Sequence, residues 1–128
     1  MEFAFLDGEH QALFQELREK LAEFRRFDKE YLSVVYLMAG CPEFQKKAAK
    51  YFDGQEGGFF SEEMFKEQDF SSGIHAIAKL AVHLFNGNKD VLPLELIAST
   101  DARLFKLAIN ALILRRYGLS RQYRVLDE

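Results

Sequence analysis

The side chains with the clearest capacity for chemistry are three histidines, His10, His75 and His83. His75 and His83 lie eight residues apart on one predicted helix, with Lys79 between them on the same face. Zinc sites on a helix favour histidines at positions i and i+4, whereas eight residues span about 12 Å of helical rise. The pair therefore cannot hold one ion directly, and His10 would reach either of them only through tertiary packing. We predict surface or capped histidines, with no metal ion and no other cofactor.

Cys41 is the only cysteine in the chain, and it stands immediately before Pro42 at a predicted helix start. A helix N-terminus lowers the pKa of a thiol, but a reactive cysteine also needs a histidine or a cation nearby, and the sequence names none. A lone cysteine also packs well as a small hydrophobic residue. We therefore predict no catalytic role for Cys41 and no enzyme activity. Because one cysteine excludes an internal disulfide, the reducing cytosol is the expected location.

Two further segments have compositions that some ligand sites share. The loop at 54–58 is rich in glycine, but Glu56 inside it would repel a phosphate, and no Gly-Lys-Ser/Thr sequence follows. An acidic cluster around and after the loop lacks the Asp-x-Asp-x-Asp-Gly spacing of a calcium loop. Its members are Glu56, Glu62, Glu63, Glu67 and Asp69. We interpret the loop as a flexible connector that would present Phe59 and Phe60 to a partner.

The C-terminal segment interleaves arginine with tyrosine. Residues 101–128 contain six basic and three acidic residues, in a protein whose net charge is −3. Arginine and tyrosine together suit phosphate contacts and base stacking, but nucleic-acid-binding domains are usually basic overall. The helix dipole also favours cations near a helix C-terminus. The candidate surface for a protein partner or an anion comprises Phe59, Phe60, Arg115, Arg116, Arg121, Tyr123 and Arg124.

Helical periodicity dominates the elements that must carry these residues. Asp7 and Asp28 are suited to begin helices, and Gly40, Gly87 and Gly118 are suited to end them. Between these signals, apolar residues recur three and four positions apart. The expected helices run from Asp7 to about residue 24 and over 29–39, 42–52, a short stretch from Ser61, 72–86, a short stretch from Pro93, and 101–117. The sequence therefore predicts an all-α bundle of five main helices and one or two short ones.

The helix at 101–117 is apolar almost all the way round. Only a narrow stripe with Arg103, Lys106 and Asn110 is polar. A helix that is apolar on most of its circumference must be covered by other helices. We therefore place it at the centre of the bundle, beside the helix at 29–39. The expected core comprises Leu13, Phe14, Leu17, Leu21, Val34, Val35, Met38, Phe44, Ile77, Ala81, Leu84, Leu104, Leu107, Ala108, Ala111 and Leu112.

Length and composition indicate one globular domain. A chain of 128 residues has the usual size of a single domain, and we predict one domain over 1–128 with a frayed polar tail at 119–128. No segment reaches the roughly 18 apolar residues that a membrane span requires. The N-terminus lacks the basic start and the apolar run of a signal peptide. Thirteen phenylalanines without a tryptophan exceed the expected need of the core, so we expect an exposed apolar patch.

A series of landmarks along residues 8–117 is similar to one family of proteins. The landmarks are Glu9-His10, Leu13-Phe14, Tyr36-Leu37-Met38-Ala39-Gly40, Ser71-Ser72-Gly73, Leu84-Phe85-Asn86-Gly87, Leu92-Pro93-Leu94-Glu95-Leu96, the stretch 104–111, and Arg115-Arg116-Tyr117. Their order resembles a family of small proteins of unknown function from Gram-positive bacteria and their phages or prophages. The chain has His83-Leu84-Phe85-Asn86-Gly87 where that family carries Phe-Asn-Leu-Tyr-Asn-Gly. The resemblance implies a helical fold and mobile-element ancestry, and it transfers no catalytic residue.

The function most consistent with these observations is a non-enzymatic protein–protein interaction or regulatory module that binds a protein partner or a second copy of itself. Two alternatives remain open at this point. One is a nucleic-acid-associated regulator that uses the Arg/Tyr-rich C-terminus, and it predicts salt-sensitive binding that depends on residues 115–128. The other is a helical protein that binds a small molecule or a metal, and it predicts a pocket lined by His75, His83 or Cys41. The sequence predicts no membrane partner.

Overall fold

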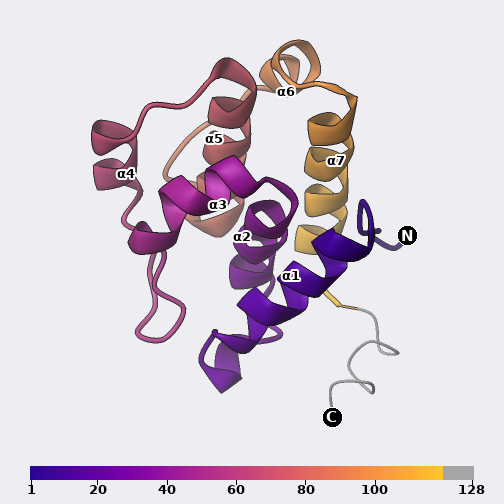
Figure 1. Ribbon diagram of the computed structural model, residues 1–128, viewed down its shortest axis with the longest axis vertical. Coiled ribbons are helices and arrows are strands. Elements are labelled where there is room, and N and C mark those ends of the chain that lie inside the picture. The colour runs from indigo at the N-terminus through magenta and orange to yellow at the C-terminus, as the bar shows by residue number, and fades with distance from the viewer. Residues whose placement is uncertain (120–128) are drawn as a thin grey trace.

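The computed structural model describes residues 1–119, and this part of the chain is helical without a strand (Figure 1). The prediction of an all-α fold is therefore confirmed. One isolated antiparallel bridge joins Phe52 to Phe59. The elements are α1 (Gly8–Glu19), η1 (Glu23–Arg25), α2 (Lys29–Gly40), α3 (Pro42–Ala48), η2 (Ala49–Tyr51), α4 (Ser61–Glu67), α5 (Ser72–Asn86), α6 (Pro93–Ser99) and α7 (Ala102–Tyr117).

The division into long and short helices differs from the prediction. The described chain has four helices of 12 to 16 residues and three of seven. The expected helix at 42–52 ends as an α-helix at Ala48 and continues as the 3-10 turn η2. The expected cap side chains of Asp7 and Asp28 accept hydrogen bonds from the backbone amides of His10 and Glu30. The predicted tail at 119–128 lies outside the described residues, apart from Leu119, which is buried.

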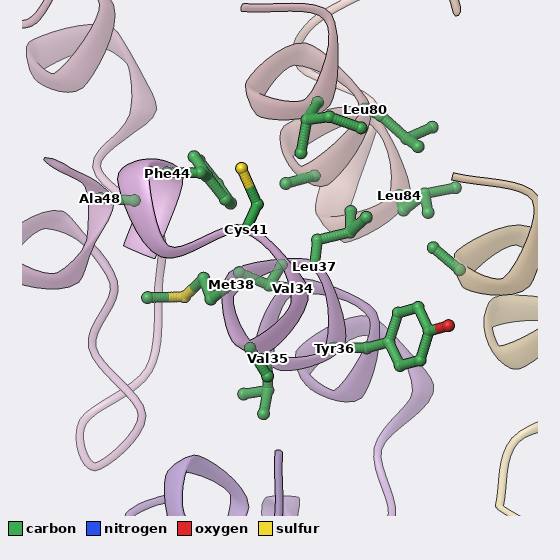
Figure 2. Packing of buried hydrophobic residues seen from close by; sticks show 14 of the residues in the cluster. Val34, Val35, Tyr36, Leu37, Met38, Cys41, Phe44, Ala48, Leu80 and Leu84 are labelled. Atoms are coloured by element: carbon green, nitrogen blue, oxygen red, sulfur yellow. The ribbon is translucent and has the colours of Figure 1, made fainter. Parts of the chain in front are cut away.

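Helix α2 is the centre of the bundle. Every residue from Tyr31 to Cys41 is buried, and α2 packs against α1, α3, α5 and α7. Figure 2 shows Val35, Tyr36, Leu37 and Met38 pointing in different directions around this helix. A helix that is apolar on all sides can satisfy each face only by contacting a different neighbour. The sequence therefore codes α2 as the element on which the others assemble.

Of the helices that pack against α2, α7 makes the most extensive contact, as expected. The prediction that the helix at 101–117 lies at the centre is wrong, because its neighbours α2, α5 and α6 leave one face uncovered. Leu112, an expected core residue, is exposed on that face together with Phe105 and Ile109. Figure 1 shows α7 forming one flank of the molecule. The apolar residues of α7 thus divide between a buried face and a solvent-facing stripe.

The N-terminal segment is held against α2 and α7 by buried polar groups. The amide of Ala4 donates to Asn110 Oδ1 at 2.8 Å, and Tyr36 Oη donates to the Ala4 carbonyl at 2.6 Å. His10 Nδ1 accepts from the Leu6 amide, so Nε2 carries the proton that is donated to the Tyr36 carbonyl, both at 3.0 Å. His10 is therefore held neutral by its partners, and a buried polar side chain of this kind needs both of its hydrogen bonds.

Leu107→Asp and Leu112→Asp separate the two faces of α7. Leu107 is fully buried, and an unpaired buried carboxylate should lower the free energy of unfolding by about 3–5 kcal/mol out of a total near 10 kcal/mol. Leu112 faces solvent, so its substitution should cost about 1 kcal/mol or less. Urea unfolding followed by circular dichroism measures both values. Equal losses in the two variants would contradict the one-sided burial of α7.

Acid should destabilise the protein through His10. Burial lowers the pKa of His10 from its ordinary value of 6.5, so the unfolded chain takes up this proton at a higher pH than the folded chain. The contribution of His10 to stability is therefore complete above pH 6.5 and decreases as the pH falls below it. Urea midpoints measured from neutral pH downward should show this loss.

The matched control for that experiment is His83→Gln, because the His83 ring is exposed. Replacement of His10 by glutamine should lower stability at neutral pH and flatten the pH dependence, and the control shows the effect of the same substitution at an exposed histidine. Burial and Lys79 also lower the pKa of His75, so His75→Gln is measured alongside. A pH dependence that survives in His10→Gln would contradict the assignment to His10.

Candidate interaction surface

The two loop phenylalanines that were predicted to face a partner point in opposite directions. The Phe59 ring is buried, with its centroid 5.5 Å from that of Phe52 and 6.0 Å from that of Phe85. Phe60 is 54% exposed. The prediction is therefore wrong for Phe59, because the bridge to Phe52 turns its ring inward. Only Phe60 remains available on this loop.

The glycine-rich loop, expected to be a flexible connector, is a turn with several side-chain hydrogen bonds. Asp53 Oδ1 accepts from the amides of Gln55 and Glu56 at 3.1 and 2.9 Å. The guanidinium of Arg25 donates to the carbonyls of the same two residues at 2.7 and 3.2 Å. Gly57 has a φ of +97°, and a Cβ there would lie 2.5 Å from Arg25 Nη2. The glycine is thus explained by backbone conformation and close packing, and phosphate binding is not needed to account for it.

The two described arginines of the predicted surface have different environments. Arg115 Nε donates to the Leu84 carbonyl at 2.8 Å, and Nη2 lies 3.6 Å from Glu30 Oε1. Arg115 therefore ties α7 to α5 and α2. Arg116 is exposed, and its guanidinium lies over the Tyr117 ring at 5.5 Å. The remaining predicted members, Arg121, Tyr123 and Arg124, lie outside the described residues.

The histidines have structural partners. His75 stacks on the Phe70 ring with an interplanar angle of 9°, and His83 Nδ1 lies 2.8 Å from the Lys89 carbonyl. His10 is buried. Within residues 1–119 no three His, Cys, Asp or Glu side chains are grouped so that they could hold a metal ion. The geometry therefore brings no two histidines into one site.

Cys41 is buried, and burial raises the pKa of its thiol. This direction is opposite to the lowering that a helix N-terminus alone would produce, because desolvation disfavours the thiolate. A cavity of about 170 Å³ lies between α1, α2 and α3, and its walls include Leu17, Val35 and Met38 but neither Cys41 nor a histidine. A separate open hollow is lined by His75, Lys79, Lys89 and Asp90 and contains no serine, threonine or cysteine. Neither of these two hollows places a serine, threonine or cysteine beside a histidine, the pairing that activates a hydroxyl or thiol nucleophile.

Helix α7 has a solvent-facing apolar stripe that the sequence analysis did not predict. It consists of Phe105, Ile109 and Leu112, which are 37%, 40% and 41% exposed and lie on one face at positions i, i+4 and i+7. We call these three residues the α7 stripe. The signal was present in the sequence, since the helix carries more apolar residues than one buried face requires. This excess of apolar residues predicts burial on all sides of the helix, and the structure instead places part of it in solvent.

Basic residues flank the α7 stripe. Helix α7 contains Arg103, Lys106, Arg115 and Arg116 and no acidic residue. Arg103 pairs with Asp7 at 3.2 Å and Arg115 lies near Glu30. Among residues 1–119, Lys106 and Arg116 have no carboxylate partner. The stripe is therefore apolar along its length, with the cation Lys106 beside it and Arg116 at its C-terminal end.

Helix α6 places more apolar side chains in solvent next to the start of α7. Leu96 is buried, and Glu95 forms an ion pair with Lys79 on α5. A Cβ at Gly73 would lie 2.9 Å from the Ser99 carbonyl, so α5 and α6 approach closely. Because this face of α6 packs against α5, Leu94 and Ile97 on α6 remain exposed. Helices α6 and α7 thus both carry exposed apolar side chains, and most of these side chains are aliphatic.

Comparison with known proteins gives one match. The sequence model of a family described as "Family of unknown function (DUF6075)" matches residues 1–126. No curated protein and no solved structure matches the chain. The expected resemblance to a family of unknown function is confirmed at that level, and the expected distribution in Gram-positive bacteria and their phages stays a prediction. Within residues 1–119, no helix combines the length and the apolar character that a membrane crossing demands.

Arg115→Ala and Arg116→Ala test which arginine has a structural role. Loss of Arg115 leaves the Leu84 carbonyl without its donor and removes the cation near Glu30, so the free energy of unfolding should fall by about 1–2 kcal/mol. Arg116→Ala removes only exposed groups and should change it by less than about 0.5 kcal/mol. Urea unfolding of both variants provides the comparison. If Arg115→Ala has the same free energy of unfolding as the wild-type protein, Arg115 has no structural role and is a free surface cation.

Proposed function

Because the chain belongs to the DUF6075 family of unknown function, we propose its role from the surface it presents: it is a protein-interaction module that docks a partner on the α7 stripe. Its setting in this proposal is the cytosol of a Gram-positive bacterium or of a cell that carries one of its phages. The proposal assigns no catalytic step to the protein. The observation that supports it most directly is the regular exposure of Phe105, Ile109 and Leu112.

The physical argument is one of hydration. Burying the exposed part of each of these three side chains would contribute about 1 kcal/mol toward association. Single exposed apolar residues are common on protein surfaces, whereas a row on one helix face marks an interaction site. The α7 backbone is held by its packing on α2 and by the Arg115 contacts. A partner would therefore meet a preorganised surface, which reduces the entropy lost on binding.

The nucleic-acid alternative has less support. Of the cations expected to contact phosphates, Arg115 is occupied by the Leu84 carbonyl and by Glu30. The net charge of the chain is −3, which opposes the long-range attraction that nucleic-acid binding depends on. A copurifying nucleic acid, detected by absorbance at 260 nm and removed by salt, would favour that alternative.

Ile109→Glu should abolish partner binding without unfolding the protein. The substitution places a charge in the middle of the α7 stripe at a residue that is already 40% exposed. Tagged wild-type and variant proteins are incubated with host lysate, and captured proteins are identified by mass spectrometry. Light scattering behind size exclusion measures self-association in the same samples. We expect a partner or a dimer that wild-type protein retains and Ile109→Glu loses.

Phe60→Glu is the matched control, because Phe60 is an exposed apolar residue outside the stripe. It should retain every partner that the wild-type protein captures. If Phe60→Glu loses the partner and Ile109→Glu keeps it, the 59–60 loop surface replaces the α7 stripe as the docking site. If both variants capture the same proteins as the wild type, neither surface is used and the proposal is wrong.

A further inference from the structure

We propose that the partner element which docks on the α7 stripe is an amphipathic helix with acidic flanks. This inference rests on the proposed function, and it specifies the shape and the charge of the occupant. Three observations carry it: the spacing of the stripe, its length, and the charges at its edges.

The spacing matches helix-on-helix packing. Together with Ala102 and Arg116, the stripe forms a row with steps of three and four residues along α7. Such a row is the seam against which a second helix packs when its own apolar residues have the same spacing. The described residues 1–119 offer no strand edge to which an extended peptide could add. From Ala102 to Arg116 the seam is about 21 Å long, which corresponds to about four turns of a partner helix.

The charges select an acidic partner. Lys106 flanks the seam and Arg116 ends it, and within residues 1–119 neither is paired with a carboxylate. Glutamates beside the apolar seam of a partner helix would meet these two cations. A surface ion pair contributes up to about fivefold in affinity. The same charges disfavour a partner that carries lysine at its flanks.

A second copy of this chain fits the stripe less well. Two α7 helices packed against each other would bring two sets of basic residues together, because α7 contains no acidic residue. A stable protein interface also buries about 800 Å² on each partner, which is more than three half-exposed side chains provide. The stripe is therefore suited to a single helix bound transiently.

The test uses two designed peptides that differ only in charge. Each is a fluorescein-labelled helix with leucine at the seam positions, and the flanks are glutamate in one and lysine in the other. Fluorescence anisotropy measures the binding of each to the full chain at low salt. We expect the acidic peptide to bind at least about tenfold more tightly, and we expect this preference to shrink as salt is added.

Variants of the full chain locate the binding. Ile109→Glu should abolish binding of the acidic peptide, Phe60→Glu should leave it unchanged, and Lys106→Glu should reduce the preference for the acidic peptide. If both peptides bind equally and Ile109→Glu still abolishes binding, the charge inference is overturned while the proposed function stands. If neither peptide binds, or if binding is indifferent to Ile109→Glu, the helical occupant is overturned, and the lysate experiment then decides the proposed function separately.

Two other occupants would also overturn the inference. If the wild-type protein is a dimer that is dissociated by Ile109→Glu but not by the acidic peptide, the stripe binds a second copy of the chain. A chain shortened to end at Leu119 that binds both peptides much more tightly than the full chain would assign it to residues 120–128. Retention of the acidic preference in the shortened chain supports an external acidic helix.

Discussion

The burial of α2 on every side is the constraint on which the rest of the structure depends. Close approach is required where α2 ends, since a Cβ at Gly40 would lie 2.3 Å from Leu107 Cδ1 and 3.0 Å from His10 Nε2. Three elements, α1, α2 and α7, thus meet around a residue without a side chain. Gly40 is the last residue of α2, and its lack of a side chain lets α1 and α7 pack closely at this point.

The interior around α2 also contains polar groups, and these groups form hydrogen bonds. Ser33 Oγ donates to the Lys29 carbonyl at 2.7 Å, and the Tyr36 hydroxyl and His10 ring are both bonded to backbone groups. Burial raises the pKa of Tyr36 above its ordinary value and lowers that of His10, so both side chains remain neutral. Neutral groups with satisfied hydrogen bonds carry little desolvation penalty. The same groups fix the N-terminal segment on α2.

Helices α1 and α7 each pack one face against α2 and expose the other face to solvent. For α1 the outer face is polar, as a surface helix requires. For α7 it is apolar, because Phe105, Ile109 and Leu112 continue the hydrophobic character of the buried face into solvent. The side chains that could take part in chemistry, by contrast, have structural roles. Cys41 is buried, and His10 and Arg115 donate hydrogen bonds to backbone carbonyls within the fold. Solvent therefore meets an apolar surface on α7 and a polar one on α1.

The sequence by itself determined the helical class and the caps Asp7 and Asp28 of α1 and α2, because caps and apolar periodicity are local signals. It also indicated that α2 and α7 pair, since both helices carry apolar residues on most of their circumference. Tertiary structure alone decided which of the two apolar helices is central, and it turned Phe59 inward while leaving Phe60 exposed. Periodicity states how much of a helix is apolar, but not how many neighbours are available to cover it. Four helices pack on α2 and only one side of α7 is covered, so the same kind of sequence became a core in one case and a surface in the other.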